Sequence, residues 1–406
     1  MMTQIESATQ GRITEEMKRV ALAEGIDEEV VRERVANGEI VIMRSVGIGK
    51  GLRTKINANI GTSSVAVDPA LEVEKAKVAV KCGADTVSDL SMGGDIDGIR
   101  REILQAVSVP ITTVPIYQAV VRCSFQKMAQ KDIIETIRKQ VMDGVSSIVI
   151  HAGFVLETLP LLKERTMGMV SKGGAFTAAW MLEHNSENPF QEGFDDILDI
   201  VHDNDVVLSL GNAMRSGCVH DMQDGPQLQE IKANTELADR ANDAGIQVII
   251  EGMGGHIWAR DIEKYVKYHK EVTRNRPLFV AGPLPIDVAV GYDHIAACVG
   301  ASLASGAGAD YLCAVTPSEH LALPDLEHVR EGVIAFRIAA HIGDTIKYGL
   351  SDRDLKLAMM RRGRNWEGQF KFALDEERAR EIHSQEGCTM CGEYCALEIM
   401  DKYLGS

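Results

Sequence analysis

The sequence predicts a (β/α)8 barrel of the TIM type with a small N-terminal segment and a helical C-terminal domain. Two observations indicate this α/β fold: short apolar runs alternate with helical segments, and the alternation stops near residue 345. Such alternation is typical of a parallel sheet, and about eight repeats favour a closed barrel over a doubly wound open sheet. We expect an N-terminal helical and loop domain at 1–54, the catalytic barrel at 55–345 and a C-terminal helical domain at 346–406.

The N-terminal part begins with two short amphipathic helices, expected at 14–24 and 28–37. Thr14 and Asp27 precede them, and both residue types are favoured helix N-caps because their side-chain oxygens accept free N–H groups of the first turn. The glycine-rich stretch VGIGKGLR at 46–53 follows. Its spacing matches neither common phosphate-binding glycine motif, so we expect a flexible turn there.

The barrel part contains nine apolar runs of strand length, one more than a barrel needs. One of the nine is therefore expected to lie outside the barrel. Helix signals fill the connections: Asp68-Pro69, for example, supplies an N-cap and the first residue of a helix. The nine runs are 55–61, 85–91, 112–118, 146–153, 168–174, 206–212, 247–253, 278–284 and 310–317.

Charge and hydropathy exclude several classes of partner. The chain carries 59 acidic and 43 basic residues, which gives a net charge of −16. Such a surface repels phosphate backbones, so we expect no nucleic-acid partner, although a small phosphorylated substrate needs only local cations. The sequence lacks an apolar run of about 18 residues and an apolar signal-peptide core. We therefore expect no membrane association and a cytoplasmic location.

Polar side chains recur where the predicted strands end, and in a parallel barrel these ends form the active-site face. His256 and His320 are the best metal candidates, since imidazole binds zinc, iron or manganese; a hydrogen-bonded loop histidine is the alternative. Glu251 either joins them or accepts a proton. Lys172 and Arg215 are possible phosphate partners by charge. The remaining candidates are Lys50, again for phosphate, and Asn59, Asp89, Tyr117, His151, Ser171 and Asn212.

Three of the eight cysteines, Cys388, Cys391 and Cys395, lie within the motif CTMCGEYC. The C-x2-C-x3-C spacing suits a [4Fe–4S] cluster that keeps one iron free of protein ligands. That iron can bind S-adenosylmethionine (SAM) and pass it an electron, which releases a 5′-deoxyadenosyl radical. Zinc is the rival, but a structural zinc site needs four ligands and would take His383. A disulfide is disfavoured in the cytoplasm.

An ordered set of motifs resembles the phosphomethylpyrimidine synthase family, the noncanonical radical SAM enzymes that form the thiamine pyrimidine. The resemblance covers nearly the whole chain. It implies a barrel with a C-terminal cluster domain, the substrate 5-aminoimidazole ribotide, an electron donor such as flavodoxin or ferredoxin, and a homodimer in which each cluster segment completes the partner's site. The motifs are INANIG, ADTVSDLS, PITTVPIYQA, IHAG, VSKGG, VIIEG, GYDHI, VTPSEHLALP, EGVIAFRIAAH and CTMCGEYC.

The resemblance also implies roles for individual residues. His256 and His320 match the two histidines of the family's divalent metal, which lies beside SAM, and Cys388, Cys391 and Cys395 match its cluster ligands. The positions that match substrate contacts are Asn59, Tyr117, His151, Ser171, Gly173, Arg215 and Glu251.

Several positions depart from the family pattern, mostly around the substrate. Ser88 stands where the family usually has Met, Lys172 where it has Arg, and Phe279 where it has Tyr. The usual Asp-Gly-Leu-Arg is replaced by Asn212, Ala213, Met214 and Arg215. One residue is added before His256, and the last cysteine spacing is one residue shorter than usual. The loss of such polar groups changes the hydrogen bonds available to a polar ligand, and mismatches of this kind discriminate strongly between ligands.

The altered substrate shell is similar to that of the anaerobic branch that makes 5-hydroxybenzimidazole, the lower ligand of a cobamide. We therefore predict a radical SAM carbon–carbon lyase that rearranges 5-aminoimidazole ribotide to 5-hydroxybenzimidazole. Glu251 and Asp89 would transfer protons, while Tyr117, Ser171, Lys172 and Arg215 would orient the substrate. The thiamine pyrimidine synthase is the alternative. Two other classes stay open: a zinc-dependent non-redox barrel, such as an aldolase or hydrolase, and an inactive ligand-binding paralogue.

Overall fold

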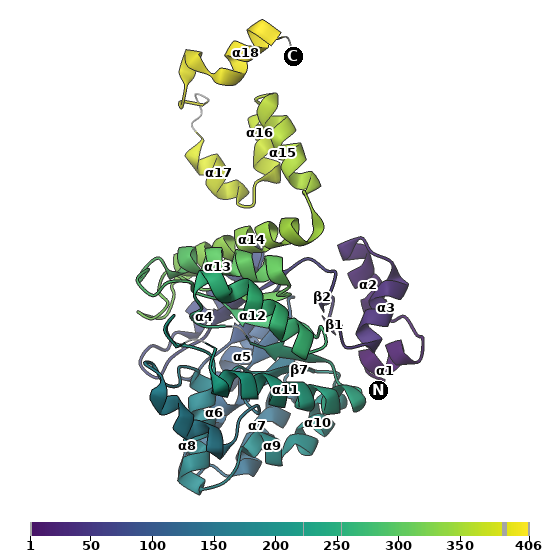
Figure 1. The fold of residues 1–406 in the computed structure, drawn as a ribbon, viewed down its shortest axis with the longest axis vertical. Coiled ribbons are helices and arrows are strands. Elements are labelled where there is room, and N and C mark those ends of the chain that lie inside the picture. The colour runs from purple at the N-terminus through teal and green to yellow at the C-terminus, as the bar shows by residue number, and fades with distance from the viewer. Residues whose placement is uncertain (1, 222, 253, 384–387, 405–406) are drawn as a thin grey trace. The chain divides into compact units, whose positions relative to one another are not determined.

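The computed structural model describes residues 2–221, 223–252, 254–383 and 388–404. Contacts divide the chain into two compact units, Met1–Lys347 and Tyr348–Ser406. The first unit contains the N-terminal helices together with the barrel, and the second contains the terminal helices and the cysteine motif (Figure 1). Each unit is described by itself below.

The first unit is built on a closed barrel of eight parallel strands, which confirms the predicted fold class. The strands pair in the order β10-β3-β4-β5-β6-β7-β8-β9, so each strand lies beside the next one in sequence and β10 closes on β3. The strands are β3 (Lys55–Ile60), β4 (Thr86–Asp89), β5 (Ile111–Thr113), β6 (Ser147–Ile150), β7 (Val207–Leu210), β8 (Val248–Glu251), β9 (Leu278–Ala281) and β10 (Tyr311–Cys313).

The surplus ninth run is 168–174, and its assignment as a strand is wrong. This segment is a loop that leads into α8 (Lys172–His184), where the Ser171 hydroxyl accepts the Gly174 N–H at 3.1 Å and caps the helix. The run at 112–118 is only partly a strand. Pro115 cannot donate to the strand ladder, and it opens α6 (Pro115–Cys123) directly after β5.

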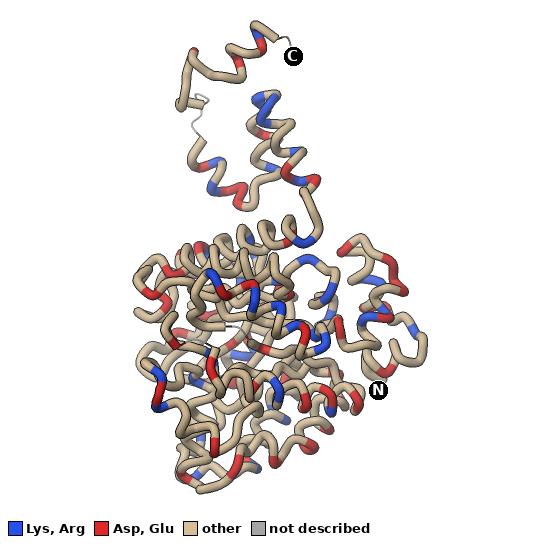
Figure 2. The backbone as a smooth tube through the Cα atoms, viewed as in Figure 1, with Lys and Arg blue, Asp and Glu red and all other residues tan. Residues whose placement is uncertain are grey.

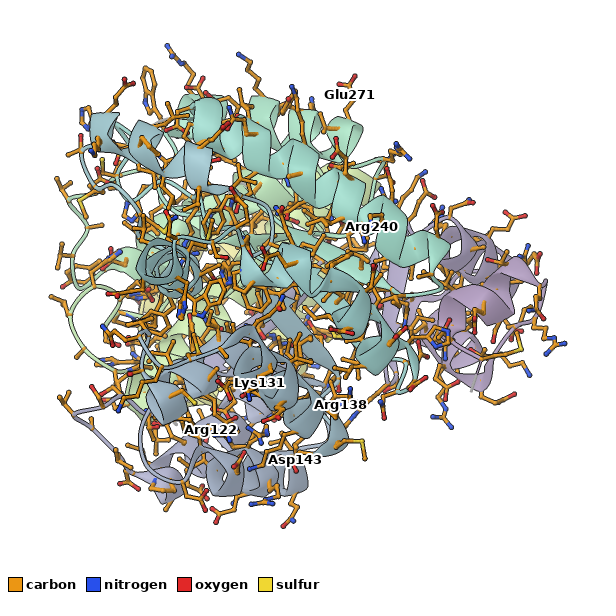
Figure 3. All side chains as sticks on the ribbon, turned by 90° about the horizontal axis from the view of Figure 1, so that it is seen from below. Arg122, Lys131, Arg138, Asp143, Arg240 and Glu271 are labelled. Atoms are coloured by element: carbon orange, nitrogen blue, oxygen red, sulfur yellow. The ribbon has the colours of Figure 1, made fainter. Side chains whose placement is uncertain are left out.

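Helices surround the barrel wall, as the ribbon and the view from below show (Figures 1 and 3). Charged side chains such as Lys131, Arg138 and Arg240 project outward from them. The helices of the first unit after α6 and before the last one are α7 (Gln130–Met142), the 3-10 helix Leu156–Glu164, α9 (Pro189–Glu192), α10 (Phe194–His202), α11 (Gly225–Asp243), α12 (Ala259–Val272) and α13 (Asp293–Ala307). Besides α6 and α8, the other helices around the barrel are α4 (Pro69–Lys81), α5 (Ile96–Ala106) and α14 (Leu326–Tyr348).

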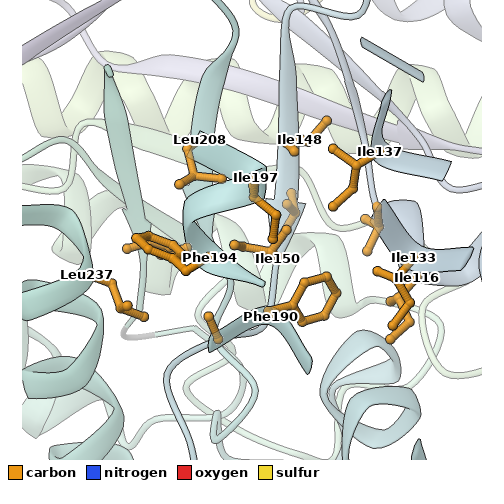
Figure 4. Close-up of a cluster of buried hydrophobic side chains, with 14 of the residues drawn as sticks. Ile116, Ile133, Ile137, Ile148, Ile150, Phe190, Phe194, Ile197, Leu208 and Leu237 are labelled. Atoms are coloured by element: carbon orange, nitrogen blue, oxygen red, sulfur yellow. The ribbon is translucent and has the colours of Figure 1, made fainter. Parts of the chain in front are cut away.

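The hydrophobic core lies between the strands and these helices. In its largest cluster, Ile148 and Ile150 of β6 and Leu208 of β7 pack against apolar side chains of the covering helices, including Phe194 and Ile197 of α10 (Figure 4). All five side chains are fully buried, and burying one such side chain stabilises the fold by about 1.5–3 kcal/mol. This layer holds the strand ends in fixed positions.

The N-terminal segment contains α1 (Gln4–Thr9), α2 (Glu15–Glu24) and α3 (Glu28–Ala36). Thr14 and Asp27 cap α2 and α3 as predicted, with hydroxyl and carboxylate oxygens that accept backbone N–H groups. Helix α1 was not predicted, since six residues carry too little periodicity to reveal a helix.

An antiparallel hairpin replaces the predicted flexible turn, with β1 (Ile40–Met43) paired to β2 (Val46–Gly49). One hydrophobic cluster joins its Val41, Met43 and Ile48 to Val207, Ile249 and Tyr311 of the barrel interior. The Gln247 side chain, just before β8, bonds both backbone groups of Ile42. Because Val207 and Tyr311 begin their strands, the hairpin closes the amino-terminal end of the barrel.

The second unit contains α15 (Asp352–Arg362), α16 (Trp366–Phe372), α17 (Glu376–Ile382), the 3-10 turn Gly392–Tyr394 and α18 (Ala396–Leu404). Acidic and basic residues are interspersed over both units (Figure 2). Among the described residues, no helix is long and apolar enough to cross a membrane.

Candidate active site at the barrel mouth

The interior of the barrel is lined with polar side chains. The Asn57 side-chain oxygen of β3 accepts the hydroxyls of Thr86 at 2.9 Å and Ser88 at 3.0 Å, both from β4. Barrel interiors are more often filled by branched apolar residues. Ser88 thus lies inside the barrel, below its mouth, and a polar interior suits a polar ligand.

Asn59 lies one layer nearer the mouth, and its amide donates to the Cys313 sulfur of β10 at 3.0 Å. Burial raises the pKa of the Cys313 thiol to about 12, so the group is neutral at physiological pH. Sequence reasoning missed Cys313 as a site residue, because nothing in its spacing distinguishes it from a core cysteine.

Glu251 ends β8 and points into the barrel, where it accepts the Ser209 hydroxyl at 3.2 Å and the Asn212 N–H at 3.3 Å. Burial raises the pKa of Glu251 because desolvation disfavours the charged carboxylate. The nearby Arg215 guanidinium lowers it again. A carboxyl group whose pKa is raised above its ordinary value is suited to proton transfer.

A second carboxyl group, that of Glu230 of α11, is buried and holds the loop after β7. It accepts the Asn212 side-chain amide at 2.5 Å and the N–H groups of Ala213 and Met214 at 2.7 and 2.9 Å. Burial raises the pKa of Glu230 to about 7. Arg215 follows directly and donates to the Asn212 carbonyl at 3.0 Å. Sequence reasoning missed Glu230, since a single helix glutamate carries no signal of its role.

Tyr117 and His151 lie on the opposite wall of the mouth, and both are buried. Burial raises the pKa of Tyr117 to about 12 and lowers the pKa of His151 to about 3, so both rings are neutral. Gly173 lies directly against His151, since a Cβ on Gly173 would fall 2.2 Å from the imidazole carbon Cε1. The Lys172 ammonium lies 5.3 Å from the Tyr117 ring centre, where a cation–π contact is favourable.

A cavity of about 250 Å³ opens at the mouth and brings together four of the predicted residues, Asn59, Arg215, His256 and His320. Cys313 and Glu319 also line it. Burial raises the pKa of Glu319, while the neighbouring His320 and Arg215 lower it.

The two histidines lie with their ring centres 5.2 Å apart. His256 Nδ1 is 2.6 Å from an Asp287 carboxylate oxygen, and His320 Nδ1 is 3.6 Å from Asp293. A carboxylate hydrogen-bonded at Nδ1 is the usual outer partner of a metal-binding histidine, because it fixes the ring and leaves Nε2 for the metal. His256 has such a bond, whereas the His320–Asp293 contact is longer than a hydrogen bond. The pair therefore fits a divalent metal ion.

Three predicted residues have other surroundings. Asp89 alternates with Ser88 along β4, so its side chain faces the covering helices, and it accepts the Ser91 N–H at 3.0 Å. The structure thus places Asp89 apart from Glu251. Phe279 points inward and stacks on Tyr311 with ring centres 4.1 Å apart, below the mouth. Lys50 pairs with Glu39 at 2.6 Å beside the hairpin, at the opposite end of the barrel.

The second unit carries the three clustered thiols. Cys388 and Cys391 are exposed, and Cys395 is half-buried directly before α18. A cavity of about 510 Å³ within this unit is lined by Cys388, Trp366 and His383, among others. His383 stacks on Trp366 with ring centres 4.6 Å apart. Three accessible thiols within eight residues fit the ligand set of an iron–sulfur cluster.

A parallel barrel with a polar mouth, joined to a helical unit with three clustered thiols, defines an enzyme of the cofactor-dependent barrel class. The chain belongs to the Radical SAM ThiC family, whose model matches residues 3–402. Membership implies a [4Fe–4S] cluster and SAM, and it argues against the zinc-dependent non-redox alternative.

Curated relatives align with this chain over nearly its whole length. A phosphomethylpyrimidine synthase of a Thermoanaerobacter species is 46% identical over 428 aligned residues, which cover 100% of this chain and 99% of the relative. The proteins of the same name in Methanoculleus marisnigri and Geobacter metallireducens are also 46% identical, covering 99% and 98% of this chain and 99% and 97% of their own.

Proposed function

We propose that this radical SAM enzyme acts on 5-aminoimidazole ribotide and forms the thiamine precursor hydroxymethylpyrimidine phosphate. The names of the curated relatives support this product better than the benzimidazole that the substrate shell led us to expect. The observation that carries the proposal is the convergence of Asn59, Arg215, His256 and His320 on one cavity, with Glu251 held by the same loop as Arg215.

Different side chains of the mouth would bind different parts of the substrate. Arg215 and Lys172 supply positive charge for the phosphate of the ribotide, in a molecule that is otherwise strongly acidic. Asn59, Ser171, Tyr117 and His151 supply neutral hydrogen-bonding groups. Glu251 is the group that accepts or returns a proton, because its pKa is raised and it faces the interior. Asp89 takes no part in this proposal.

The cofactors are assigned by ligand chemistry. Cys388, Cys391 and Cys395 would hold the [4Fe–4S] cluster, which supplies the electron for reductive cleavage of SAM when bound. His256 and His320 would hold one divalent metal, for which zinc, iron and manganese all suit imidazole. An electron donor such as flavodoxin or ferredoxin and a homodimer also belong to the proposal, as in the family resemblance.

The benzimidazole synthase remains the second candidate because of a specific observation. Asn212 bonds Glu230, and its side-chain oxygen has no hydrogen-bond partner although it is buried. Phe279 stacks on Tyr311 and offers no hydroxyl to a ligand. Where the family usually has Asp and Tyr, this chain thus provides a neutral amide and an apolar ring, which would favour a different arrangement of ribose fragments.

A product assay tests the proposal. The enzyme, with its cluster reconstituted anaerobically, is incubated with 5-aminoimidazole ribotide, SAM and a reductant, and the products are separated by mass spectrometry. We expect hydroxymethylpyrimidine phosphate and 5′-deoxyadenosine. Formation of 5-hydroxybenzimidazole instead would establish the second candidate. SAM binding without release of 5′-deoxyadenosine would reject both in favour of an inactive paralogue.

A paired variant sharpens the choice between the two products. Asn212→Asp combined with Phe279→Tyr restores the side chains that the family usually carries at these positions. If the two positions select the product, the product ratio changes in this double variant. Cys298→Ser, a substitution of a partly buried residue on α13, serves as the control and should leave the ratio unchanged.

A further inference from the structure

Three potential metal ligands converge beside the barrel mouth but outside the histidine pair. Cys218 and His220 belong to the loop that follows β7, and Asp287 belongs to the loop that follows β9. One ligand atom of each residue, a sulfur, an imidazole nitrogen and a carboxylate oxygen, lies within 4.8 Å of the other two. His220 is exposed, and the other two are half-buried, so ions in solution can reach the group.

Other hydrogen bonds hold the two loops together without using the Cys218 sulfur or the His220 ring. The Asp287 carboxylate accepts the Val219 N–H at 3.0 Å. The loop after β7 is also joined to the segment after β8, because the His256 backbone N–H donates to the Ser216 carbonyl at 3.2 Å and the Ser216 hydroxyl donates to the His256 carbonyl at 2.5 Å. The backbone is therefore already arranged for the three ligands, which lowers the ordering cost of binding an ion.

Asp221 anchors the far side of the same loop. Its carboxylate accepts the N–H groups of Thr166 and Met167, each at 2.7 Å. A divalent cation would displace the proton of the Cys218 thiol, since the thiolate is the form that binds metals.

We propose that Cys218, His220 and Asp287 form a second metal site for a zinc-class divalent cation, separate from the His256–His320 pair. A thiolate, an imidazole and a carboxylate are together typical zinc ligands, with bonds of about 2.0–2.3 Å, and they leave a fourth position for water. Because the three ligand atoms all lie within 4.8 Å of one another, they need to close by at most about 1 Å to reach tetrahedral spacing.

Asp287 links the proposed site to the mouth. Its oxygen Oδ1 is the atom that lies 2.6 Å from His256 Nδ1, while the same carboxylate accepts the Val219 N–H. A cation bound at Cys218 and His220 would therefore share a carboxylate with the histidine that faces the cavity. The proposed ion is placed to fix the orientation of His256 without contacting the substrate.

Cobalt(II) tests the site, because thiolate ligation to this ion gives a charge-transfer absorption that imidazole and carboxylate ligands do not give. The full-length chain is prepared with Cys388, Cys391 and Cys395 all changed to Ser, so that the terminal thiols cannot contribute. We expect Co²⁺ to produce the thiolate band by the addition of about two equivalents, because the His256–His320 pair also takes this ion, and zinc to abolish the band by competition. Absence of the band would overturn the proposal.

Further substitutions in the same background distinguish the two metal positions. Cys218→Ser should abolish the thiolate band, and His220→Ala should weaken Co²⁺ binding at least about tenfold. His256→Ala should keep the band, because His256 is not one of the three ligands. Cys298→Ser is the matched control and should keep it as well. A band that survives Cys218→Ser, or that is lost with His256→Ala while circular dichroism shows intact folding, would contradict the assignment.

Discussion

Glu230 is buried and Glu251 is half-buried, and the two carboxyl groups lie on either side of the same loop with different surroundings. Glu251 accepts two hydrogen bonds and faces the barrel interior, whereas Glu230 accepts three and faces the loop from α11. Burial raises the pKa of both groups. At the scale of single residues, the position of a carboxyl group therefore decides whether it serves proton transfer or holds a loop.

Replacing Glu251 tests its assignment as the proton-transfer group. Glu251→Gln keeps the size of the side chain but removes the titrating proton, so we expect turnover to fall by about 10²–10⁴-fold with little change in ribotide binding. The pH–rate profile should also lose the limb that rises as Glu251 ionises, above the ordinary value of 4.5. Glu74→Gln, an exposed substitution on α4, is the control. Full activity of Glu251→Gln would remove Glu251 from the mechanism.

The raised pKa of Glu230 predicts that the stability of the folded chain depends on pH. The pKa of Glu230 is raised from 4.5 to about 7 in the folded chain, so the folded state favours the protonated form. The resulting stability is fully present below pH 4.5 and is lost as the pH rises through 7. Glu230→Gln does not titrate, so its stability relative to the unchanged chain should rise over this window, by on the order of 3 kcal/mol. Urea unfolding of both chains at several pH values measures this difference in the free energy of unfolding. A difference that does not change with pH would contradict the raised pKa of Glu230.

At the scale of whole elements, the barrel strands were predictable because each is a short apolar run between helix signals. Seven of the nine predicted runs contain a barrel strand, and an eighth, 112–118, overlaps the end of β5. The ninth, 168–174, failed because a helix N-terminus with a serine cap and two glycines has no pattern that separates it from a strand end. The hairpin β1–β2 was missed for a related reason, since its glycines indicate a turn more strongly than its apolar residues indicate strands.

The same contrast applies to the site. Residues at strand ends, such as Asn59 and Glu251, could be predicted from their order along the chain, because parallel strands all end on one face. Glu230 and Asp287 could not, since a helix residue and a loop residue reach the mouth only through tertiary packing. Asp89 shows the converse limit, because its strand position was right but the alternation along β4 turns its side chain outward.

The packing of the hairpin β1–β2 predicts that a single substitution in it destabilises the barrel. Ile48 is 0% exposed and packs against the closed end of the barrel. Ile48→Ala should destabilise the first unit by about 2–5 kcal/mol, because a cavity replaces the lost methyl groups. Catalysis should continue in the remaining folded protein, since the mouth lies at the other end of the strands. Leu22→Ala, at a residue that is 86% exposed, should change stability by less than about 0.5 kcal/mol. Equal effects of the two substitutions would contradict the role of the hairpin.

At the scale of the whole molecule, binding and cofactor chemistry are divided between two units. The mouth residues all belong to Met1–Lys347, which has its own hydrophobic core, while the clustered thiols belong to Tyr348–Ser406. The barrel was predictable from its repeats, whereas the function of the second unit was predictable only from the cysteine spacing, because its helices carry few buried residues.

This division predicts that radical chemistry can be removed without unfolding the barrel. In the chain with Cys388, Cys391 and Cys395 changed to Ser, we expect loss of bound iron, of the visible cluster absorption and of 5′-deoxyadenosine formation. The thermal unfolding of the first unit should not change, because Cys388 and Cys391 are exposed and none of the three contributes to the barrel core. Cys123→Ser, a change at a partly buried residue on α6, should keep both iron and activity. Retention of a four-iron cluster by the triple variant would show that other residues bind it, and the assignment of the C-terminal motif would then be wrong.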